Sequence, residues 1–429
     1  MTVASQQPVP TTKLTGRDLY KHMGSPKKIV APMVDQSELA WRRLSRQLGA
    51  DLCYTPMFHA KQFATVEKYR AQMFDALDGD KTADRPLVVQ FCANDPETLL
   101  QAAKFVEDHC DAVDLNLGCP QNIAKKGKYG SFLQDDWDLI YKLINILHVN
   151  LSVPVTAKIR MFTSKERTLE YAKMILSAGA QILTVHGRTR EMKGQQTGLA
   201  DWSIIRYLRD NLPPDTVIFA NGNLLYHEDI SRCLEATGAD AVMSAEGNLH
   251  NPALFCQPLS YSTSIPAHED IDVLYPRLDI LLRRYFNVLK DTPGEASRIA
   301  AKSHLFRILR PFLGIHIDVR AEVAALHKQS PIEDFATITE HVEKIVHNLL
   351  LDQNNRERDI VRRSHQPLDD SGAVYKDIPY WRAQPYFKPV SGQILYGGKR
   401  KLEESAEIPD NADKREKLQV VSTKQAASS

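Results

Sequence analysis

The sequence predicts an α/β protein: a (β/α)8 TIM barrel, followed by a smaller helical-bundle domain and a disordered C-terminal tail. Short apolar runs alternate with amphipathic helical stretches, and the alternation repeats eight times in about 230 residues, as a (β/α)8 barrel requires. Gly49, Gly179 and Gly238 end three of the helical stretches just before the next apolar run. A doubly wound sheet is the alternative, but no run leads into a Gly-rich dinucleotide fingerprint.

The predicted strands are short and apolar, and polar or turn-forming residues separate them from the helices. The strands cover residues 29–33, 52–55, 87–91, 112–117, 155–159, 182–186, 217–220 and 241–244. The predicted helices carry apolar residues at helical spacing and cover residues 38–48, 97–109, 137–148, 166–178, 202–211 and 228–237. Strand and helix therefore follow one another in chain order, which favours a parallel barrel.

The pattern changes along the chain and predicts five segments. Residues 1–14 form a disordered N-terminus, and residues 15–265 form the barrel. Residues 266–355 lack a strand pattern and predict a helical domain, with helices over 273–290, 297–310, 319–327 and 332–351. Residues 356–398 are an extended segment that packs on the body, and residues 399–429 are too polar to build a core and form a disordered tail.

Composition narrows the class of protein. Hydrophobic content of 43% and charged content of 25% are typical of a soluble globular protein. No apolar run is long enough to cross a bilayer, and the N-terminus has no apolar signal core, so no membrane partner is expected. The six cysteines show neither CxxC pairs nor metal-ligand spacing, which favours reduced thiols and no metal site. Because the net charge is only +1, a nucleic acid would need a local basic face.

The segment from Asp114 to Pro120 (Asp-Leu-Asn-Leu-Gly-Cys-Pro) carries the strongest sign of chemistry. An apolar strand stops at Gly-Cys-Pro, so Asn116 and the thiol of Cys119 are expected at the mouth of the barrel, where such folds keep their active sites. A lone cysteine there could simply fill a turn. Polar residues recur, however, at the ends of four other predicted strands: Gln90, Lys158, His186 and Asn221.

These strand-end residues suit a flat heteroaromatic ring with a phosphate tail, and FMN fits that description. Residues 32–34, which are Pro32, Met33 and Val34, would contact one face of the ring, and Gln90 its polar edge. Lys158 would offset negative charge on the reduced ring, although a solvated lysine is the alternative. His186 would hydrogen-bond the ligand or, alternatively, cap its own loop. The loops after the last two strands, with Asn221, Gly222, Asn223, Ala245 and Glu246, would hold the phosphate.

Taken together, these motifs resemble the tRNA-dihydrouridine synthases, FMN enzymes that reduce the C5–C6 double bond of uridines in tRNA. The resemblance runs over roughly residues 15–389, and within the family it is strongest to the eukaryotic type that modifies uridines 16 and 17 of the D-loop. Its sharpest motifs are residues 31–37, 89–94, 114–120, 158–160, 185–188 and 220–222, and residues 244–249 and 378–385 look specific to that type.

The resemblance implies roles for individual residues. Cys119 matches the proton donor, and Asn116 and Arg160 match positions that hold the substrate uracil. The flavin contacts fall on Pro32, Met33, Val34, Gln90, Lys158, His186, Asn221, Gly222, Asn223, Ala245 and Glu246. NADPH or NADH would supply the hydride. One position departs from the bacterial pattern, which has Gly-Arg where this chain has Ala245-Glu246, so backbone N–H groups would have to do more of the phosphate binding.

Contact with tRNA rests on basic side chains in two places. Lys125 and Lys126 follow the Cys119 loop and would meet phosphates or close over the site. Lys302, Arg307 and Arg310 lie on the predicted helix 297–310 in the helical domain, where a solvated helix face is the alternative. Residues 380–382 would stack on bases or, as the favoured alternative, pack back on the bundle. Residues 399–401 (Lys-Arg-Lys) are a weak nuclear-localisation cue, so a cytoplasmic or nuclear location is expected, with a monomer favoured.

Two other functions remain open at this point. The first is an FMN barrel that acts on a free pyrimidine, like a dihydroorotate dehydrogenase, although such an enzyme has no need of the helical domain. The second is an RNA-binding protein that has lost catalysis, against which the set of Cys119, Lys158 and His186 argues.

Overall fold

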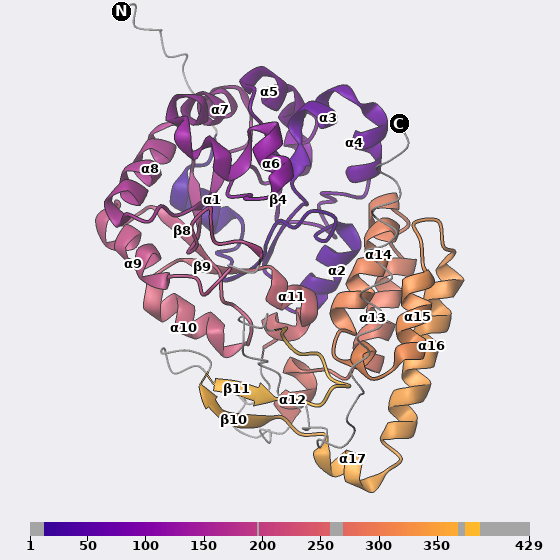
Figure 1. Ribbon diagram of the computed structural model, residues 1–429. Coiled ribbons are helices and arrows are strands. Elements are labelled where there is room, and N and C mark those ends of the chain that lie inside the picture. Colours follow the sequence, from indigo (N-terminus) through magenta and orange to yellow (C-terminus); the bar gives the residue numbers. More distant parts are fainter. Residues whose placement is uncertain (1–12, 195–196, 258–268, 368–373, 387–429) are drawn as a thin grey trace, which may run out of the picture. The chain divides into compact units, whose positions relative to one another are not determined.

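The computed structural model describes residues 13–194, 197–257, 269–367 and 374–386. Nine strands form one parallel sheet, and eight of them close into a barrel, because β1 pairs with β9 on one side and with β2 on the other, and β2 also pairs with β4 (Figure 1). The barrel strands are β1 (Lys28–Val30), β2 (Leu52–Tyr54), β4 (Leu87–Cys92), β5 (Ala112–Leu117), β6 (Val155–Arg160), β7 (Ile182–His186), β8 (Val217–Asn221) and β9 (Ala241–Ser244). The predicted (β/α)8 barrel is confirmed, with every strand within a few residues of its predicted place.

Helices connect successive barrel strands. Those between strands are α2 (Leu39–Gln47), α5 (Pro96–Lys104), α7 (Trp137–Asn150), α8 (Lys165–Ser177), α9 (Trp202–Asn211) and α10 (Glu228–Thr237), and α1 (Gly16–His22) precedes β1. Four begin where an Asp or Ser side chain accepts a backbone N–H of the first turn: Asp95, Asp136, Ser164 and Asp201. Local capping and the apolar spacing agree, which is why the sequence predicts these helices well.

Several short elements have no counterpart in the prediction. They are β3 (Phe58–His59), α3 (Ala60–Thr65), α4 (Glu67–Met73), α6 (Asn122–Gly127), α11 (Glu246–His250) and the 3-10 helices Gly130–Asp135 (η2), Pro252–Phe255 (η4) and Phe312–Gly314 (η6), whereas the 3-10 helix Glu107–His109 (η1) forms the end of the predicted helix 97–109. None spans enough residues to show a helical or strand period of its own. Most of them lie in the loops that leave the strands, so they shape the mouth of the barrel.

The helical region follows the barrel and shares its hydrophobic core. Its helices are α12 (Glu269–Leu274), α13 (Leu278–Lys290), α14 (Glu295–Ile308), α15 (Ile317–Ala325), α16 (Ile332–Leu349) and α17 (Gln353–Arg358). The single helix predicted over residues 273–290 is wrong. Pro276 lacks an N–H and disfavours helical backbone in the preceding residue, so α12 stops at Leu274 and α13 starts only at Leu278. Trp41 from the barrel and Tyr285 from α13 belong to one continuous core cluster.

Residues 378–386 pack against the helical region. Trp381 and Arg382 are buried, and Arg382 donates hydrogen bonds to both carboxylate oxygens of Asp359 at 2.5 and 2.8 Å and to the carbonyl of Tyr275 at 2.9 Å. The buried Trp381 ring therefore packs against the helical region. This favours the alternative in which residues 380–382 pack on the bundle, and it disfavours the one in which they stack on bases. Before it, β10 (Arg362–Pro367) and β11 (Val374–Asp377) pair antiparallel.

Some predictions lie outside the described residues: nearly all of the N-terminal segment 1–14, the tail 399–429 and its Lys399-Arg400-Lys401. The barrel and the helical region belong to one compact unit. Within the described ranges no helix is long and apolar enough to cross a membrane, and no cluster of three His, Cys, Asp or Glu side chains could hold a metal ion.

Candidate active site

The polar residues predicted at strand ends lie on adjacent strands at one end of the barrel. Backbone pairing places Asn116 opposite Lys158, and it places Arg160, His186 and Asn221 side by side across β6, β7 and β8. Because parallel strands all finish at the same end of a barrel, this pairing brings the predicted set together at the mouth. Their convergence comes from strand register and not from closeness in the sequence.

A chain of hydrogen bonds runs across three of these strands and ends at the Cys119 loop. Asp114 on β5 accepts hydrogen bonds from Thr156 Oγ1 at 2.6 Å and from Gln90 Nε2 at 2.7 Å. Gln90 Oε1 in turn accepts from Asn116 Nδ2 at 2.8 Å. Asn116 Oδ1 then accepts the backbone N–H groups of Gly118 at 3.1 Å and of Cys119 at 2.9 Å. Each amide is thereby fixed in orientation, and the last one sets the position of the thiol.

Asp114 has no role in the sequence prediction, yet it anchors this chain of hydrogen bonds. Burial raises the pKa of its carboxyl to about 6, although the bonds from Thr156 and Gln90 favour the charged form. The signal that could have found it is a single charged residue inside the otherwise apolar strand 112–117. A buried carboxylate with its acceptor sites occupied orders its neighbours, because an unpaired one would be costly.

Cys119 is a partly accessible thiol on a well-held loop. Its carbonyl accepts hydrogen bonds from Ser131 N–H at 3.1 Å and Ser131 Oγ at 3.0 Å. Gly130 sits at φ +66°, and a Cβ there would lie 2.7 Å from the Cys119 carbonyl oxygen, so the close approach requires glycine. Burial raises the pKa of the Cys119 thiol above its usual value. The group therefore keeps its proton at neutral pH and can donate it.

Lys158 brings a positive charge to the floor of the same mouth. Its ammonium donates to Asn221 Oδ1 at 2.8 Å, and Asn221 Nδ2 donates to the carbonyl of Met243 at 2.8 Å. Burial, followed by the charge of Arg160, lowers the pKa of Lys158 to about 8. The ammonium is still mostly protonated at pH 7, and desolvation strengthens its effect on any negative charge that develops beside it.

His186 and Arg188 join the ends of β7 and β8. The Arg188 guanidinium donates to His186 Nε2 at 2.9 Å and to Asn223 Oδ1 at 2.7 Å. Burial, with a further contribution from Lys158, holds the pKa of His186 well below its usual value, so the ring is neutral and carries its proton on Nδ1. Arg188 is a second residue without a role in the sequence prediction, although it lies in the quoted motif 185–188.

Arg160 is held by the loops around it. Its side chain donates to three backbone carbonyls: Gly118 at 2.8 Å, Thr189 at 2.7 Å and Met192 at 3.0 Å. Burial and the charge of Arg188 lower the pKa of Arg160 to about 10. Arg160 therefore ties the Cys119 loop to the loop after β7. Its predicted contact with the substrate base stays a prediction.

The segments predicted to hold the ring face and the phosphate meet at the junction of β1, β8 and β9. The Ala31 N–H donates to the Ser244 carbonyl at 2.9 Å, which brings Pro32, Met33 and Val34 beside Ala245 and Glu246. Met33 is nearly buried, whereas Val34 is 56% exposed. Gly222 and Asn223 both adopt positive φ, and a Cβ on Gly222 would lie 2.6 Å from Ala200 Cβ. The turn after β8 therefore packs closely against Ala200 and requires glycine at position 222.

Comparison with known proteins decides the family. The Dihydrouridine synthase (Dus) signature matches residues 29–347. The chain belongs to the dihydrouridine synthase family. It is 55% identical to the tRNA-dihydrouridine(16/17) synthase [NAD(P)(+)] of Saccharomyces cerevisiae, over 95% of this chain and 93% of that protein. It is 50% identical to the Schizosaccharomyces pombe protein of the same name, over 89% and 93%. A human tRNA-dihydrouridine(20a/20b) synthase-like protein is 35% identical over 54% of this chain and 72% of its own length.

The residues predicted to contact RNA differ in their surroundings: two are exposed at the barrel mouth, and three contact other residues of their own chain. Lys125 and Lys126 are exposed on α6, just beyond the Cys119 loop. Lys302 instead donates to the carbonyls of Ala324 and Leu326, both at 2.6 Å, at the end of α15. The other two helical-region cations also contact their own chain: Arg307 lies 3.5 Å from Glu246, and the Arg310 guanidinium lies 3.4 Å from the centre of the Tyr386 ring.

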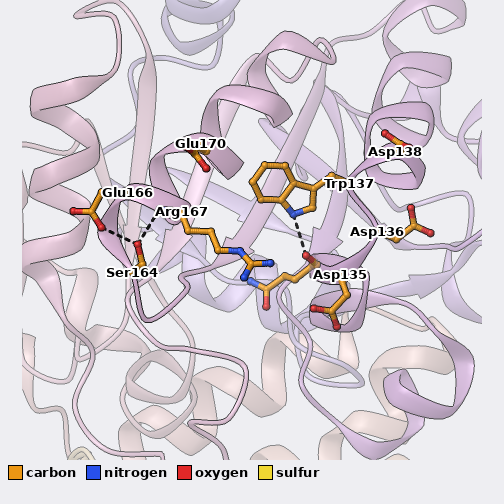
Figure 2. Close-up of a pocket in the computed structure, with 9 residues that line it drawn as sticks. Asp135, Asp136, Trp137, Asp138, Ser164, Glu166, Arg167 and Glu170 are labelled. Carbon is orange, nitrogen blue, oxygen red and sulfur yellow. Dashed lines mark hydrogen bonds between the residues drawn. The ribbon is translucent and has the colours of Figure 1, made fainter.

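A cavity of about 670 Å³ opens beside the mouth, between the beginnings of α7 and α8 (Figure 2). Most of its lining side chains are acidic; the lining residues are Gln134, Asp135, Asp136, Trp137, Asp138, Ser164, Glu166, Arg167 and Glu170. None of the predicted flavin residues lines it. Its carboxylates would repel a phosphate backbone, so RNA phosphates should approach from another side of the mouth.

Proposed function

We propose that this chain is a tRNA-dihydrouridine(16/17) synthase that reduces the C5–C6 double bond of uridines in the D-loop of tRNA, with FMN as its cofactor and NADPH or NADH as reductant. One observation carries the proposal: a protonated, partly accessible thiol on a fixed loop stands at the same barrel mouth as a desolvated ammonium. Reduction of an electron-poor double bond needs a proton donor and positive charge in this arrangement.

The residues present fit FMN. Lys158 and the amide of Gln90 offer a cation and a hydrogen-bonding edge for the ring, and the Arg188 guanidinium, which bonds to Asn223, offers a cation beside the predicted phosphate end. When bound, FMN would take hydride from NAD(P)H and supply it to uracil C6. The protein's part is to orient the two reactants, exclude water and move one proton.

Cys119 would donate its Sγ proton to uracil C5. A target uridine has to leave its stack to reach the mouth, as bases do in other enzymes that modify them. Asn116, through its bonds to the Gly118 and Cys119 N–H groups, would hold the thiol in line with C5, and Arg160 would keep the loop in register with the loop after β7. Lys158 would stabilise negative charge at the ring during the exchange.

The extent of similarity supports the 16/17 specificity. The two yeast relatives with that specificity in their names match about nine tenths or more of this chain, whereas the 20a/20b relative matches 54%. The similarity to the first group therefore extends through the helical region, to which the sequence analysis assigns tRNA contacts. It also disfavours the two alternatives, since neither a free-pyrimidine enzyme nor an inactive RNA-binding protein needs both this region and an intact mouth. A monomer in the cytoplasm or nucleus completes the proposal.

The test uses the purified full-length chain and unmodified tRNA transcripts. The purified protein should be yellow, should release FMN on denaturation, and should lose its colour when NADPH is added without oxygen. Addition of tRNA should restore the oxidised spectrum, and mapping of the product should find dihydrouridine at positions 16 and 17. Release of FAD would refute the cofactor, and reoxidation by free uracil or orotate but not by tRNA would favour the free-pyrimidine enzyme.

A further inference from the structure

Helix α14 of the helical region contacts the barrel at the loop that follows β1. Gln36 in that loop hydrogen-bonds to Ser303 Oγ, and the Ala40 N–H donates to Ser297 Oγ at 3.2 Å. His304 Nε2 donates to Glu38 Oε2 at 3.0 Å, and the His304 ring stacks on Trp41 with ring centres 4.1 Å apart. Both His304 and Trp41 are fully buried. Helix α14 is thus fixed against the segment that leads from Pro32 to α2.

The same helix also contacts the segment that follows the last barrel strand, β9. Arg307 on α14 places a guanidinium nitrogen 3.5 Å from Glu246 Oε1, at the start of α11. His250, at the end of α11, donates its Nδ1–H to the backbone carbonyl of Arg307 at 2.8 Å. Helices α11 and α14 are in contact at this junction. One helix of the helical region therefore touches both chain segments that flank the predicted phosphate end.

Glu246 places a negative charge at the segment that is predicted to hold the phosphate. Glu246 is a carboxylate at a place where a bound phosphate would add further negative charge. Two guanidinium groups are near it: that of Arg307, and that of Arg188, whose charge Glu246 stabilises and which also bonds to Asn223 after β8. The side chains of Arg307 and Glu246 are 32% and 36% exposed, so both can shift toward a ligand. A phosphate here would exchange one anionic partner of Arg307 for another.

We propose that Arg307 is a cofactor-binding residue: its guanidinium, which helix α14 places beside Glu246, binds the terminal phosphate of the flavin. This inference rests on the proposed function, and it gives the helical region a part in flavin binding besides any part in RNA binding. Arg307 supplies from outside the barrel the cation that the Ala245-Glu246 segment itself lacks.

The test compares FMN with riboflavin, which has the same ring and no phosphate. Full-length chains are stripped of flavin and titrated with each ligand, with binding followed by flavin fluorescence. Arg307→Ala should weaken FMN binding about tenfold, as expected for loss of one charge-assisted contact, and should change riboflavin binding less than twofold. Arg307→Lys should retain part of the FMN affinity. Glu246→Gln should bind FMN at least as tightly as the unaltered chain, because the competing carboxylate is gone.

The matched control is Arg283→Ala. Arg283 pairs with Glu343 between α13 and α16, and the two side chains are 35% and 34% exposed, so the control removes an equally exposed ion pair away from the barrel. It should bind both flavins as the unaltered chain does. Equal weakening of FMN and riboflavin by Arg307→Ala would overturn the proposal and make Arg307 a packing residue, and so would unchanged FMN binding. An unaltered chain that binds no FMN would refute the proposed function itself along with this inference.

Discussion

The barrel mouth and the helical region both contain many polar and charged side chains, but they use them differently. At the mouth, side chains bond to one another across strands: Gln90 to Asp114, Asn116 to Gln90, and Lys158 to Asn221. In the helical region, cations bond to backbone carbonyls or to single carboxylates, as Lys302 does at α15 and Arg283 does with Glu343. The first arrangement fixes reactive groups in a desolvated place, whereas the second mainly closes helix ends and holds helices together.

This difference implies that changes at the mouth should alter chemistry, whereas changes in the helical region should alter binding.

Cys119→Ala gives the largest expected effect. Loss of a general acid should lower the rate at which tRNA reoxidises the reduced flavin by about 10²–10⁴-fold, with reduction by NADPH nearly unchanged. Stopped-flow absorbance under anaerobic conditions measures both half-reactions. Cys256→Ala, which removes another partly accessible thiol, is the control. A normal rate of reoxidation would show that Cys119 is not the acid.

Lys158→Ala should come next and should affect the flavin half-reaction as well. Removal of one preorganised positive group costs about 10²–10³-fold. The pH dependence gives a sharper test: since the pKa of Lys158 is lowered to about 8, its charge is present below that pH and lost above it. Flavin reduction should therefore fall as pH rises through about 8, and the Lys158→Ala profile should lack this step. Lys142→Ala, exposed on α7, should keep it. Persistence of the step in Lys158→Ala would assign it to another group.

Asn116→Ala should lower the tRNA half-reaction by about 10²-fold, because the Gly118 and Cys119 N–H groups lose their acceptor and the thiol moves from its line of attack. Flavin reduction by NADPH should be little changed. Comparison with Asn145→Ala, an amide on α7 outside the mouth, separates this effect from a general loss of stability. If both half-reactions slowed equally, Asn116 would act on the flavin instead of on the acid.

The smallest expected effect concerns RNA binding. Lys125→Ala with Lys126→Ala should reduce the dependence of tRNA affinity on salt by a slope of about 1.4, at about 0.7 per phosphate contact. Lys302→Ala with Arg310→Ala should reduce it less, because Lys302 already donates to two carbonyls. Binding titrations at several salt concentrations measure both slopes. A larger change in the second pair would place the main RNA surface on the helical region, as the sequence predicts.

The barrel can be predicted from the chain's pattern alone, because strand and helix periods and helix caps are local properties that each segment carries. The same local pattern marks the polar residues of the strands: His186 and Asn221 end β7 and β8 as predicted, whereas Gln90 and Lys158 lie two residues before the ends of β4 and β6. The predicted helix 273–290 is wrong because apolar spacing continues on both sides of Pro276. The proline nevertheless separates two helices, α12 and α13.

The pairing of residues far apart in the chain follows from strand register and packing in the folded protein. In the sequence Asp114 is a single charge in an apolar strand. In the folded chain the register of β4, β5 and β6 places it between Gln90 and Thr156. In the sequence Arg307 is one more cation on a helix. In the folded chain α14 packs against α11, and Arg307 lies beside Glu246, which is 61 residues earlier in the sequence. Such partners are chosen by the closure of the barrel and by the shared core with the helical region. No local pattern encodes these contacts, because their free energy depends on burial and on charges that meet only in the folded chain.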